Sequence, residues 1–269
     1  MKTKYIALIG GEGKMPRLII EELHSRGIKV FLLAIKGITS QPLIDLADES
    51  VVIHITQIGK AIKCCLSRKI DELIMAGRVR HDTIYKLSLM KMDWTTVKLW
   101  MSMKDKRTDT ILSAIAKAFE EKGVAVIEST KYLQKYLVKR GTLTKKKVSE
   151  KILRDIELGR EVAYKLGEVD VGQTVVIKEG AVVAVEAMEG TDRCLDRAFE
   201  VGGEGAIVVK CSKLNQDMRF DVPTIGKNTI EKLIKIKASA LALEAEKTLL
   251  VDEDAVALAD NHGVAIIAF

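Results

Sequence analysis

The sequence has few of the residues that carry stacking, disulfide and metal chemistry. Aromatic residues make up 4% of the 269 residues, and the chain has 4 cysteines, 4 histidines and 3 prolines. So few aromatic side chains offer few platforms on which single-stranded bases can stack, and no nucleic-acid partner is expected. No apolar run approaches the ~20 residues that span a bilayer. The short apolar run at residues 5–9 ends in glycines and lacks a signal-peptide cleavage site, so the sequence predicts a cytoplasmic protein.

The cysteines and histidines show no ligand spacing. Cys64 and Cys65 are adjacent, Cys194 and Cys211 stand alone, and no C-x-x-C or H-x-x-x-H pattern occurs. A zinc site and a disulfide framework are therefore not expected, and the cysteines are interpreted as small hydrophobic residues.

Positive charge is concentrated in the first half of the chain. The formal net charge is +6, with 43 basic and 37 acidic residues; residues 1–134 hold 22 basic and 15 acidic side chains, and residues 135–269 hold 21 and 22. This asymmetry favours an anionic ligand or an anionic membrane surface facing the first half. A solvated lysine-rich surface is the alternative.

The pattern of apolar runs predicts an α/β protein of two domains. In the first half, strand-length apolar runs alternate with helical patterns, which is typical of a Rossmann-like parallel sheet covered by helices on both faces. In the second half, the runs at 174–178 and 181–187 flank Glu179-Gly180, a hairpin signal. We expect a nucleotide- or phosphate-binding domain at 1–134, a basic linker at 135–148 and a mixed-sheet α/β catalytic domain at 149–269.

A glycine-rich turn follows the first predicted strand. Gly11, Glu12 and Gly13 would let the backbone approach a phosphate at the start of the helix that follows. A nicotinamide dinucleotide fits poorly, because Pro16 replaces the third glycine of the fingerprint and Lys36 stands where an acid is needed. A plain strand–helix turn is the other interpretation.

A second glycine turn ends the fourth predicted strand, at Gly77, Arg78 and Val79. Ligands of parallel sheets bind at the carboxyl ends of the strands. Arg78 is therefore a candidate clamp for phosphate oxygens, although it could equally be a surface arginine.

Asp217 and Asp221 lie four residues apart in a polar stretch that includes Gln216. Two carboxylates on one face suit Mg²⁺ with a phosphate substrate, or general-base catalysis on water. We predict both as catalytic and metal-binding residues. A helix cap or a surface salt bridge is the simpler alternative for either acid.

Several of these stretches together resemble one family. They occur at residues 10–17, 75–80, 158–163, 170–173, 185–192 and 215–226. In that order, and over nearly the whole chain, the sequence resembles the UDP-2,3-diacylglucosamine pyrophosphatases of the LpxI type, which act in lipid A biosynthesis.

The resemblance implies a Mg²⁺-dependent hydrolase that splits UDP-2,3-diacylglucosamine into UMP and 2,3-diacylglucosamine 1-phosphate. It implies peripheral action at the cytosolic face of the inner membrane, and a homodimer is a further expectation. As substrate-binding residues we predict Gly11, Glu12, Gly13, Gly77, Arg78, Val79, Gln173, Glu189, Thr191, Asp192, Lys210 and Gln216.

Two other functions stay open. One is a non-catalytic protein that binds a nucleotide sugar or lipid, and the other is an NAD(P)-dependent oxidoreductase, which the strand–helix pattern alone would allow.

Overall fold

The computed structural model describes residues 4–79, 92–105, 107–212, 217–220 and 222–269. The chain forms two compact units. Residues 1–134 and the later segment 217–221 belong to the first unit, and residues 135–216 and 222–269 belong to the second. Both units are α/β, as the sequence predicts, and each has its own sheet.

The first unit is built on a parallel five-stranded sheet in the order β3-β2-β1-β4-β5. Its strands have the bounds β1 Tyr5–Gly10, β2 Lys29–Ile35, β3 Glu49–Ile53, β4 Glu72–Ala76 and β5 Ala125–Val126. The order of strands reverses between β1 and β4, the place where open α/β sheets form a ligand-binding crevice. Apolar side chains on both faces of the central strands are fully buried, for example Leu8 and Phe31.

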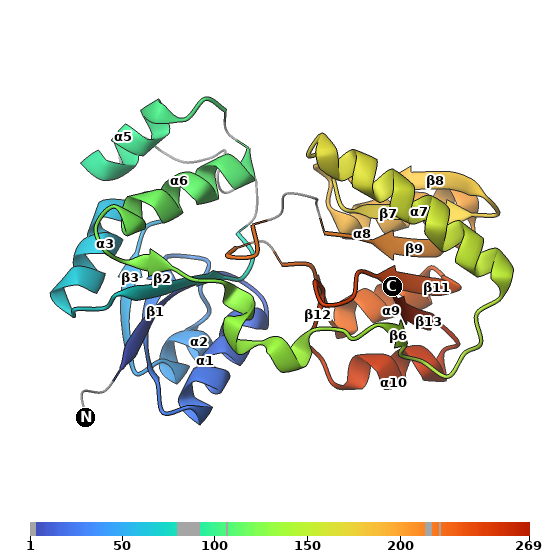
Figure 1. The fold of residues 1–269 in the computed structure, drawn as a ribbon, viewed down its shortest axis with the longest axis horizontal. Helices are drawn as coiled ribbons and strands as arrows, with labels where there is room; N and C mark the ends of the chain where they lie inside the picture. The colour runs from blue at the N-terminus through green and yellow to red at the C-terminus, as the bar shows by residue number, and fades with distance from the viewer. Residues whose placement is uncertain (1–3, 80–91, 106, 213–216, 221) are drawn as a thin grey trace. The chain divides into compact units, whose positions relative to one another are not determined.

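Helices cover both faces of this sheet (Figure 1). On one side lie α1 (Met15–Ser25) and α2 (Gln41–Leu46), and on the other lie α3 (Ile58–Ser67), α5 (Trp94–Ser102) and α6 (Thr108–Glu120). The 3₁₀ turns η2 (Ser129–Tyr132) and η3 (Gln134–Tyr136) follow β5. Among the described residues, no helix is both long enough and apolar enough to cross a bilayer.

One aspartate joins the starts of two helices in the first unit. Asp93 accepts hydrogen bonds from the Thr96 backbone N–H (2.9 Å), which caps α5, and from the Lys60 backbone N–H (3.0 Å), in the first turn of α3. The Thr96 hydroxyl also accepts from the Ile58 N–H (3.1 Å). Since these contacts satisfy otherwise unpaired N–H groups of both helices, they hold the start of α5 against α3.

The second unit contains a mixed six-stranded sheet in the order β6-β13-β11-β9-β7-β8. The strands β9, β11 and β13 are parallel, while β6, β7 and β8 are antiparallel to their neighbours. The bounds are β6 Gly141–Thr142, β7 Thr174–Lys178, β8 Ala181–Val185, β9 Ile207–Lys210, β11 Ala240–Leu243 and β13 Ala265–Ala268. A separate parallel pair joins β10 (Thr224–Ile225) to β12 (Leu249–Leu250).

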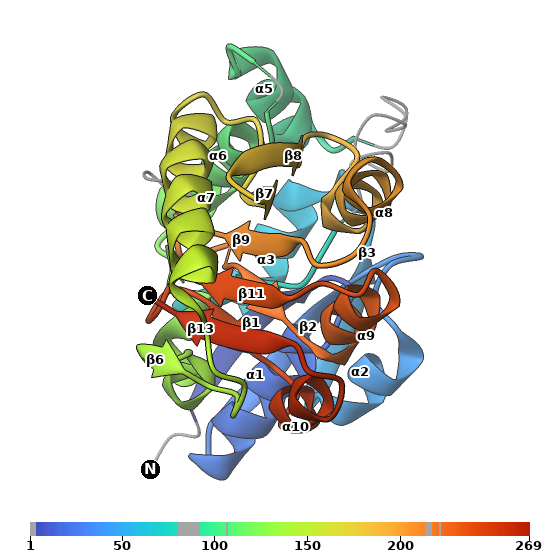
Figure 2. The ribbon, with the colours of Figure 1, turned by 90° about the vertical axis from the view of Figure 1, so that its right-hand side faces the viewer.

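This sheet is also covered on both faces (Figure 2). The long helix α7 (Glu150–Glu168) packs on one face, and α8 (Thr191–Gly202), α9 (Lys227–Lys235) and α10 (Asp254–Asn261) pack on the other. A Cβ at Gly159 of α7 would lie 2.4 Å from a Val209 side-chain carbon, so a glycine lets α7 approach β9 closely.

The predicted strands and hairpin are confirmed, and several features differ from the sequence-based expectation, among them the short strand β10. Helices α2 and α5 were not expected. Gly141–Thr142, within the predicted basic linker, form an edge strand beside β13. The sequence-based division places residues 217–220 in the second domain, but in the structure they belong to the first unit. They pack there because Phe220 joins the apolar core beneath α3 and α6.

Candidate active site

The two predicted glycine turns meet at the carboxyl edge of the first sheet. The Gly11 N–H donates to the Ala76 carbonyl (2.8 Å), and the Glu12 and Arg78 backbones exchange two hydrogen bonds of 2.9 and 2.8 Å. A Cβ at Gly11 would lie 2.7 Å from the Arg78 carbonyl oxygen. The turns can therefore approach this closely because glycine lacks a side chain, and the Gly11 and Glu12 amides are engaged within the protein instead of being directed at a phosphate.

This crossing leads to a prediction about stability. We expect Gly11→Ala to lower the free energy of unfolding by about 1–3 kcal/mol, because the new methyl group overlaps backbone atoms that cannot move away easily. Urea denaturation followed by circular dichroism measures the change. Unchanged stability would show that the two turns do not lie this close.

Arg78 projects from the crossing and keeps its charge accessible. Its guanidinium lies 3.7 Å from the Glu12 carboxylate, and its side chain is 73% exposed. Nearby, α1 begins at Met15 without a side-chain cap, with a proline in its first turn. An exposed guanidinium beside a helix N-terminus suits an anionic group. Gly13 has a φ of +101°, a conformation that favours glycine.

An open polar pocket of about 600 Å³ lies at the carboxyl end of β5. It is lined by residues of the first unit only: Val126, Ile127, Glu128, Lys131, Gln134, Asp217 and Arg219. The predicted residue Asp217 thus lies at the wall of a pocket that contains charged groups of both signs. Ile127, Glu128, Lys131 and Gln134 were not singled out in the sequence, because they follow the two-residue strand β5, which carries no motif. Arg219 lies in the stretch 215–226 but was not selected as a site residue.

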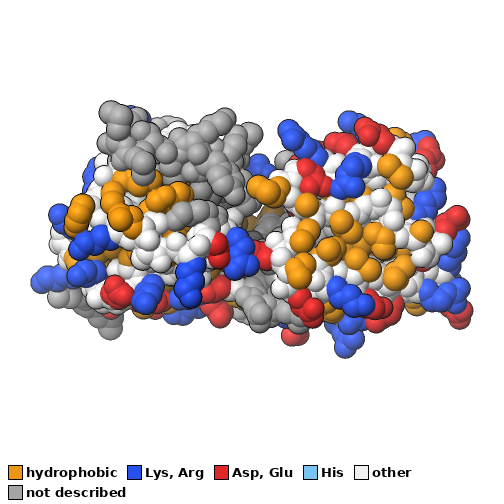
Figure 3. Space-filling model, turned by 90° about the horizontal axis from the view of Figure 1, so that it is seen from above, with side chains coloured by type: hydrophobic (Ala, Val, Ile, Leu, Met, Phe, Trp, Pro, Cys, Tyr) orange, Lys and Arg blue, Asp and Glu red, His pale blue; other side chains and the backbone are white. Residues whose placement is uncertain are grey.

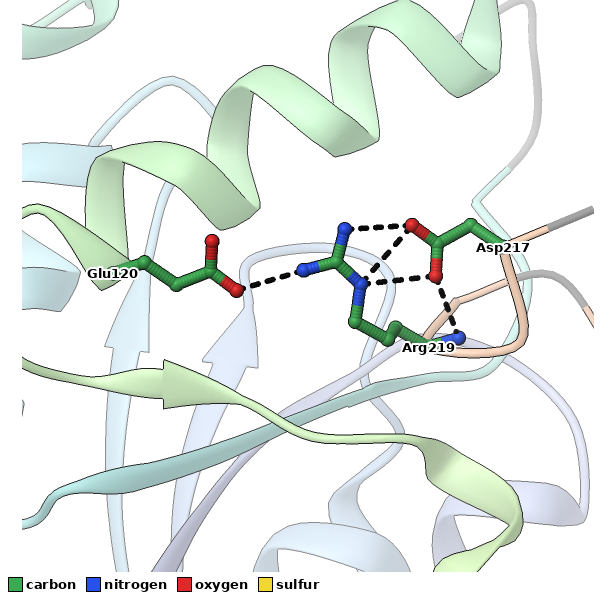
Figure 4. Close-up of polar contacts among 3 residues, drawn as sticks. All are labelled: Glu120, Asp217 and Arg219. Carbon is green, nitrogen blue, oxygen red and sulfur yellow. Dashed lines mark hydrogen bonds and ion pairs between the residues drawn. The ribbon is translucent and has the colours of Figure 1, made fainter.

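Asp217 is held by Arg219 (Figure 4). Its two carboxylate oxygens accept hydrogen bonds from Arg219 Nε (2.9 and 3.0 Å) and Nη2 (2.7 Å), while Arg219 Nη1 donates to Glu120 (2.7 Å). The guanidinium lowers the pKa of Asp217 below its ordinary value of 3.8. Asp217 therefore stays ionised and is a weak base, and a metal ion at this carboxylate would compete with Arg219. Asp221 and Gln216 lie outside the described residues.

A buried polar cluster occupies the carboxyl end of β9 in the second unit. Lys210, the last residue of β9, is only 8% exposed. Its ammonium donates to the hydroxyl of Thr191 (3.1 Å) and lies 3.5 Å from that of Thr174. In the described part of the chain, hydroxyls are its side-chain partners and no carboxylate lies within ion-pair distance. Since a buried cation is stable only with compensating charge or hydrogen bonds, this ammonium is well suited to an anionic ligand.

Helix α8 begins at the same place. Thr191 is its first residue, and Gly190 at the cap position provides no side-chain hydrogen bond. The N-terminal N–H groups and the helix dipole favour an anion there. The predicted residues Thr191 and Lys210 are thus brought together. Asp192 lies exposed in the first turn of α8, where an acid stabilises a helix start.

Glu186 extends this cluster. It is 9% exposed; its Oε1 accepts from the Thr191 hydroxyl (2.8 Å), and its buried Oε2 has no partner among the described residues. The buried Oε1 of Gln173, which directly precedes β7, is also without a partner there. Unpaired buried acceptors cost free energy, so this edge of the sheet can accept a donor or a cation. Glu186 was not singled out from the sequence, although an acid within the predicted strand 181–187 was a usable signal.

Glu189 does not join the cluster through its side chain. It accepts from Arg197 Nη2 (2.6 Å) and from the Ala187 backbone N–H (3.1 Å). The hydrogen bond from Arg197 lowers its pKa. In this conformation Glu189 stabilises the loop between β8 and α8.

The described residues offer a limited set of ligands for Mg²⁺. They contain no group of three or more His, Cys, Asp or Glu side chains placed to hold a metal ion. Mg²⁺ often binds through only one or two carboxylates together with water and substrate phosphates. The unpaired Oε2 of Glu186 fits that mode, whereas both oxygens of Asp217 already accept hydrogen bonds from Arg219.

Each unit therefore contains parallel strands, all five in the first and β9, β11 and β13 in the second, with a cationic side chain at their carboxyl edge. This arrangement is typical of α/β proteins that bind phosphorylated ligands. Comparison with known protein families identifies the family. The model of the LpxI N-terminal domain matches residues 5–136, and that of the LpxI C-terminal domain matches residues 139–267. The chain belongs to the LpxI family.

A named relative extends over the same length. UDP-2,3-diacylglucosamine pyrophosphatase LpxI of Caulobacter vibrioides is 28% identical over 274 residues, which cover 97% of this chain and 96% of the relative.

Solved structures show only weak likeness. The biotin carboxylase domain of Hydrogenobacter thermophilus 2-oxoglutarate carboxylase is 12% identical with a TM-score of 0.29, covering 73% of this chain and 40% of that chain. For glycinamide-RNase-transformylase T of Mycobacterium tuberculosis the identity is 15% and the TM-score 0.26, with 68% and 44% covered. The chain spans less than half the length of either protein, and such scores carry no functional argument.

Proposed function

We propose that this protein hydrolyses the diphosphate bond of UDP-2,3-diacylglucosamine to give UMP and 2,3-diacylglucosamine 1-phosphate. The buried Lys210 ammonium at the uncapped start of α8 is the structural observation that carries the proposal. It suits a phosphate group, and the substrate is the one for which the Caulobacter relative is named.

In the proposed reaction, water attacks one phosphorus in line and the bond from that phosphorus to the bridging oxygen breaks. The water oxygen forms the new P–O bond and a water proton leaves. Negative charge grows on the leaving phosphate as the bond breaks. Lys210 and the N–H groups at the start of α8 would stabilise this charge on the phosphate oxygens. Thr191 orients the ammonium, because its hydroxyl accepts from Lys210 and donates to Glu186.

Catalytic roles for Asp217 and Asp221 remain proposals from the sequence. A carboxylate that takes the proton from water must be ionised and have an available oxygen. Asp217 is ionised, because Arg219 lowers its pKa. One of its oxygens would become available if Arg219 turned from Asp217 toward the substrate.

We further propose that the reaction requires Mg²⁺, which, when bound, supplies charge neutralisation at the diphosphate. EDTA is expected to lower UMP release at least a hundredfold, and excess Mg²⁺ should restore it. Chromatographic measurement of UMP checks this. Full activity in the chelator would refute the metal requirement.

The two other functions make different predictions. A non-catalytic binding protein would bind the lipid nucleotide without releasing UMP. An NAD(P)-dependent oxidoreductase would show a thermal shift with NAD(P)H, which we do not expect, because the glycine turn lacks the third glycine of the dinucleotide fingerprint.

Peripheral membrane association and a homodimer are also proposed. A substrate with two acyl chains resides in a membrane, and the basic surplus in residues 1–134 favours an anionic surface. Co-sedimentation with anionic vesicles tests the first, and sedimentation equilibrium tests the second.

A further inference from the structure

The first unit contains a second pocket of different character. It has a volume of about 110 Å³ and lies at the carboxyl ends of the parallel strands, where Ile9, Ile35, Ile53 and Met75 form its floor. Helices α5 and α6 form its other walls. Open α/β sheets bind their ligands at this edge, so this pocket occupies a position where a ligand is expected.

The lining of the pocket excludes a polar ligand. No charged residue lines it, and among its described lining residues only Thr56, Thr96 and Trp100 have side chains with an O–H or N–H group. The Thr96 hydroxyl already donates to Asp93 (2.8 Å) and accepts from Ile58 (3.1 Å). A pocket of this kind favours a hydrocarbon, because a polar ligand would lose its hydration without gaining partners.

The walls of the pocket are less buried than the rest of the core. Leu99 and Trp100 of α5 and Leu112 and Ile115 of α6 are only partly buried, whereas Phe31 beneath the same helices is fully buried. The outer side of α5 carries two exposed apolar side chains, Trp94 at 71% and Met101 at 80%, and between them the exposed Lys98, whose ammonium lies 5.6 Å from the Trp94 ring centroid. Hydrophobic side chains accordingly gather on the face of the unit where α5 lies (Figure 3). This part of the unit thus has apolar surface that a hydrocarbon ligand could cover.

A charged residue directly precedes one of the pocket-lining residues in the sequence. Val79 lines the pocket, and the residue before it is Arg78, whose guanidinium is largely exposed. A ligand with an anionic head and an apolar tail matches this order of residues.

We propose that this pocket binds the end of one acyl chain of the lipid substrate. The inference rests on the proposed function for the identity of the lipid, and it assigns to the first unit a hydrocarbon-binding role in addition to phosphate binding. The cavity is smaller than the ~150 Å³ in which benzene binds in an engineered protein core. It therefore takes the terminal few methylene groups and not a whole chain.

The experiment uses Trp100 as a reporter. Trp94 is the second of the two tryptophans, is exposed and does not line the pocket, so Trp94→Phe leaves Trp100 as the single tryptophan. Below the micelle concentration, 12-bromododecanoic acid is expected to quench Trp100 fluorescence strongly and 2-bromododecanoic acid weakly, because the tail end enters the pocket. Equal quenching by both acids, or quenching by UMP and by neither acid, would overturn the proposal.

Chain length provides a second measurement. Binding of saturated fatty acids to the Trp94→Phe protein should strengthen about fourfold for each methylene group that enters the pocket. The gain should then level off once the pocket is full. A gain that continues without a plateau would indicate non-specific adsorption and contradict the proposal.

A matched pair of variants localises the site. Ala114 lines the pocket, and Ser113 beside it on α6 is exposed. Ala114→Phe should weaken fatty-acid binding at least tenfold, and Ser113→Phe should leave it unchanged, with melting curves confirming that both fold. The bromine-position contrast decides the matter if Ala114→Phe does not fold. Quenching without UMP release from UDP-2,3-diacylglucosamine would support the hydrocarbon pocket and refute the proposed reaction. UMP release without quenching would support the reaction and refute the pocket.

Discussion

Lys210→Met is expected to lower kcat/KM for diphosphate hydrolysis by about a hundredfold or more. Removing one preorganised donor that stabilises transition-state charge typically costs ~10²–10³ in rate, and Lys210 is a buried cation with hydroxyl partners. Methionine retains much of the apolar stem and removes only the ammonium. Steady-state measurement of UMP release gives the ratio.

Lys232→Met provides the matched control. Lys232 is a partly buried lysine of the same unit, but its ammonium is paired with Asp196. We expect kcat/KM to stay within about twofold of the unmodified protein, since a partly exposed ion pair contributes to stability and not to this reaction. If both variants lose activity equally while folded, or if Lys210→Met retains full activity, Lys210 does not contact the diphosphate.

Asp217→Asn and Asp221→Asn are each expected to lower kcat by two or more orders of magnitude, about the contribution of a general base, with substrate affinity kept or improved. Loss of a negative charge near a diphosphate removes a repulsion, so binding need not weaken. Single-turnover kinetics and equilibrium binding separate the two quantities.

Variants of Arg219 and Glu120 separate two roles for Asp217. If Asp217 only positions Arg219, then Arg219→Met should reproduce the effect of Asp217→Asn on both kcat and KM. If Asp217 acts on the substrate or the metal, Asp217→Asn should lower kcat much more than Arg219→Met does. Glu120→Gln is the control, because it breaks the exposed side of the same network and such ion pairs contribute at most about 1 kcal/mol. Near-normal kcat in both aspartate variants would show that the acids are structural.

Local sequence patterns predicted most of the fold. The strands β1, β4 and β7–β8 were found because each is a short apolar run bounded by glycine or a polar turn. Helix α5 was missed, since its apolar residues occur on both sides and give little helical contrast. The cap at Asp93, which accepts from the Thr96 N–H, was an unused signal of that helix start.

The sites were harder to predict, because they depend on contacts between distant residues. The two glycine turns were correctly expected at one sheet edge, but their hydrogen bonding to each other depends on a crossing that no local pattern records. Arg219 lies two residues from Asp217, so their pairing was a local signal that was not used. The contact from Arg219 to Glu120 spans 99 positions, so the sequence could not place this pair on the first unit. Lys210 and Thr191 lie 19 positions apart and meet because β9 ends beside the start of α8.

The most direct test of the proposed reaction is a product balance. Purified protein is incubated with UDP-2,3-diacylglucosamine and Mg²⁺, UMP and 2,3-diacylglucosamine 1-phosphate are quantified, and Lys210→Met prepared in parallel excludes a contaminating hydrolase. We predict that both products form in equal amounts, and that the variant forms neither at more than about one hundredth of the rate. Tight binding of the lipid nucleotide with no UMP, or equal release by the two preparations, would contradict the proposed function.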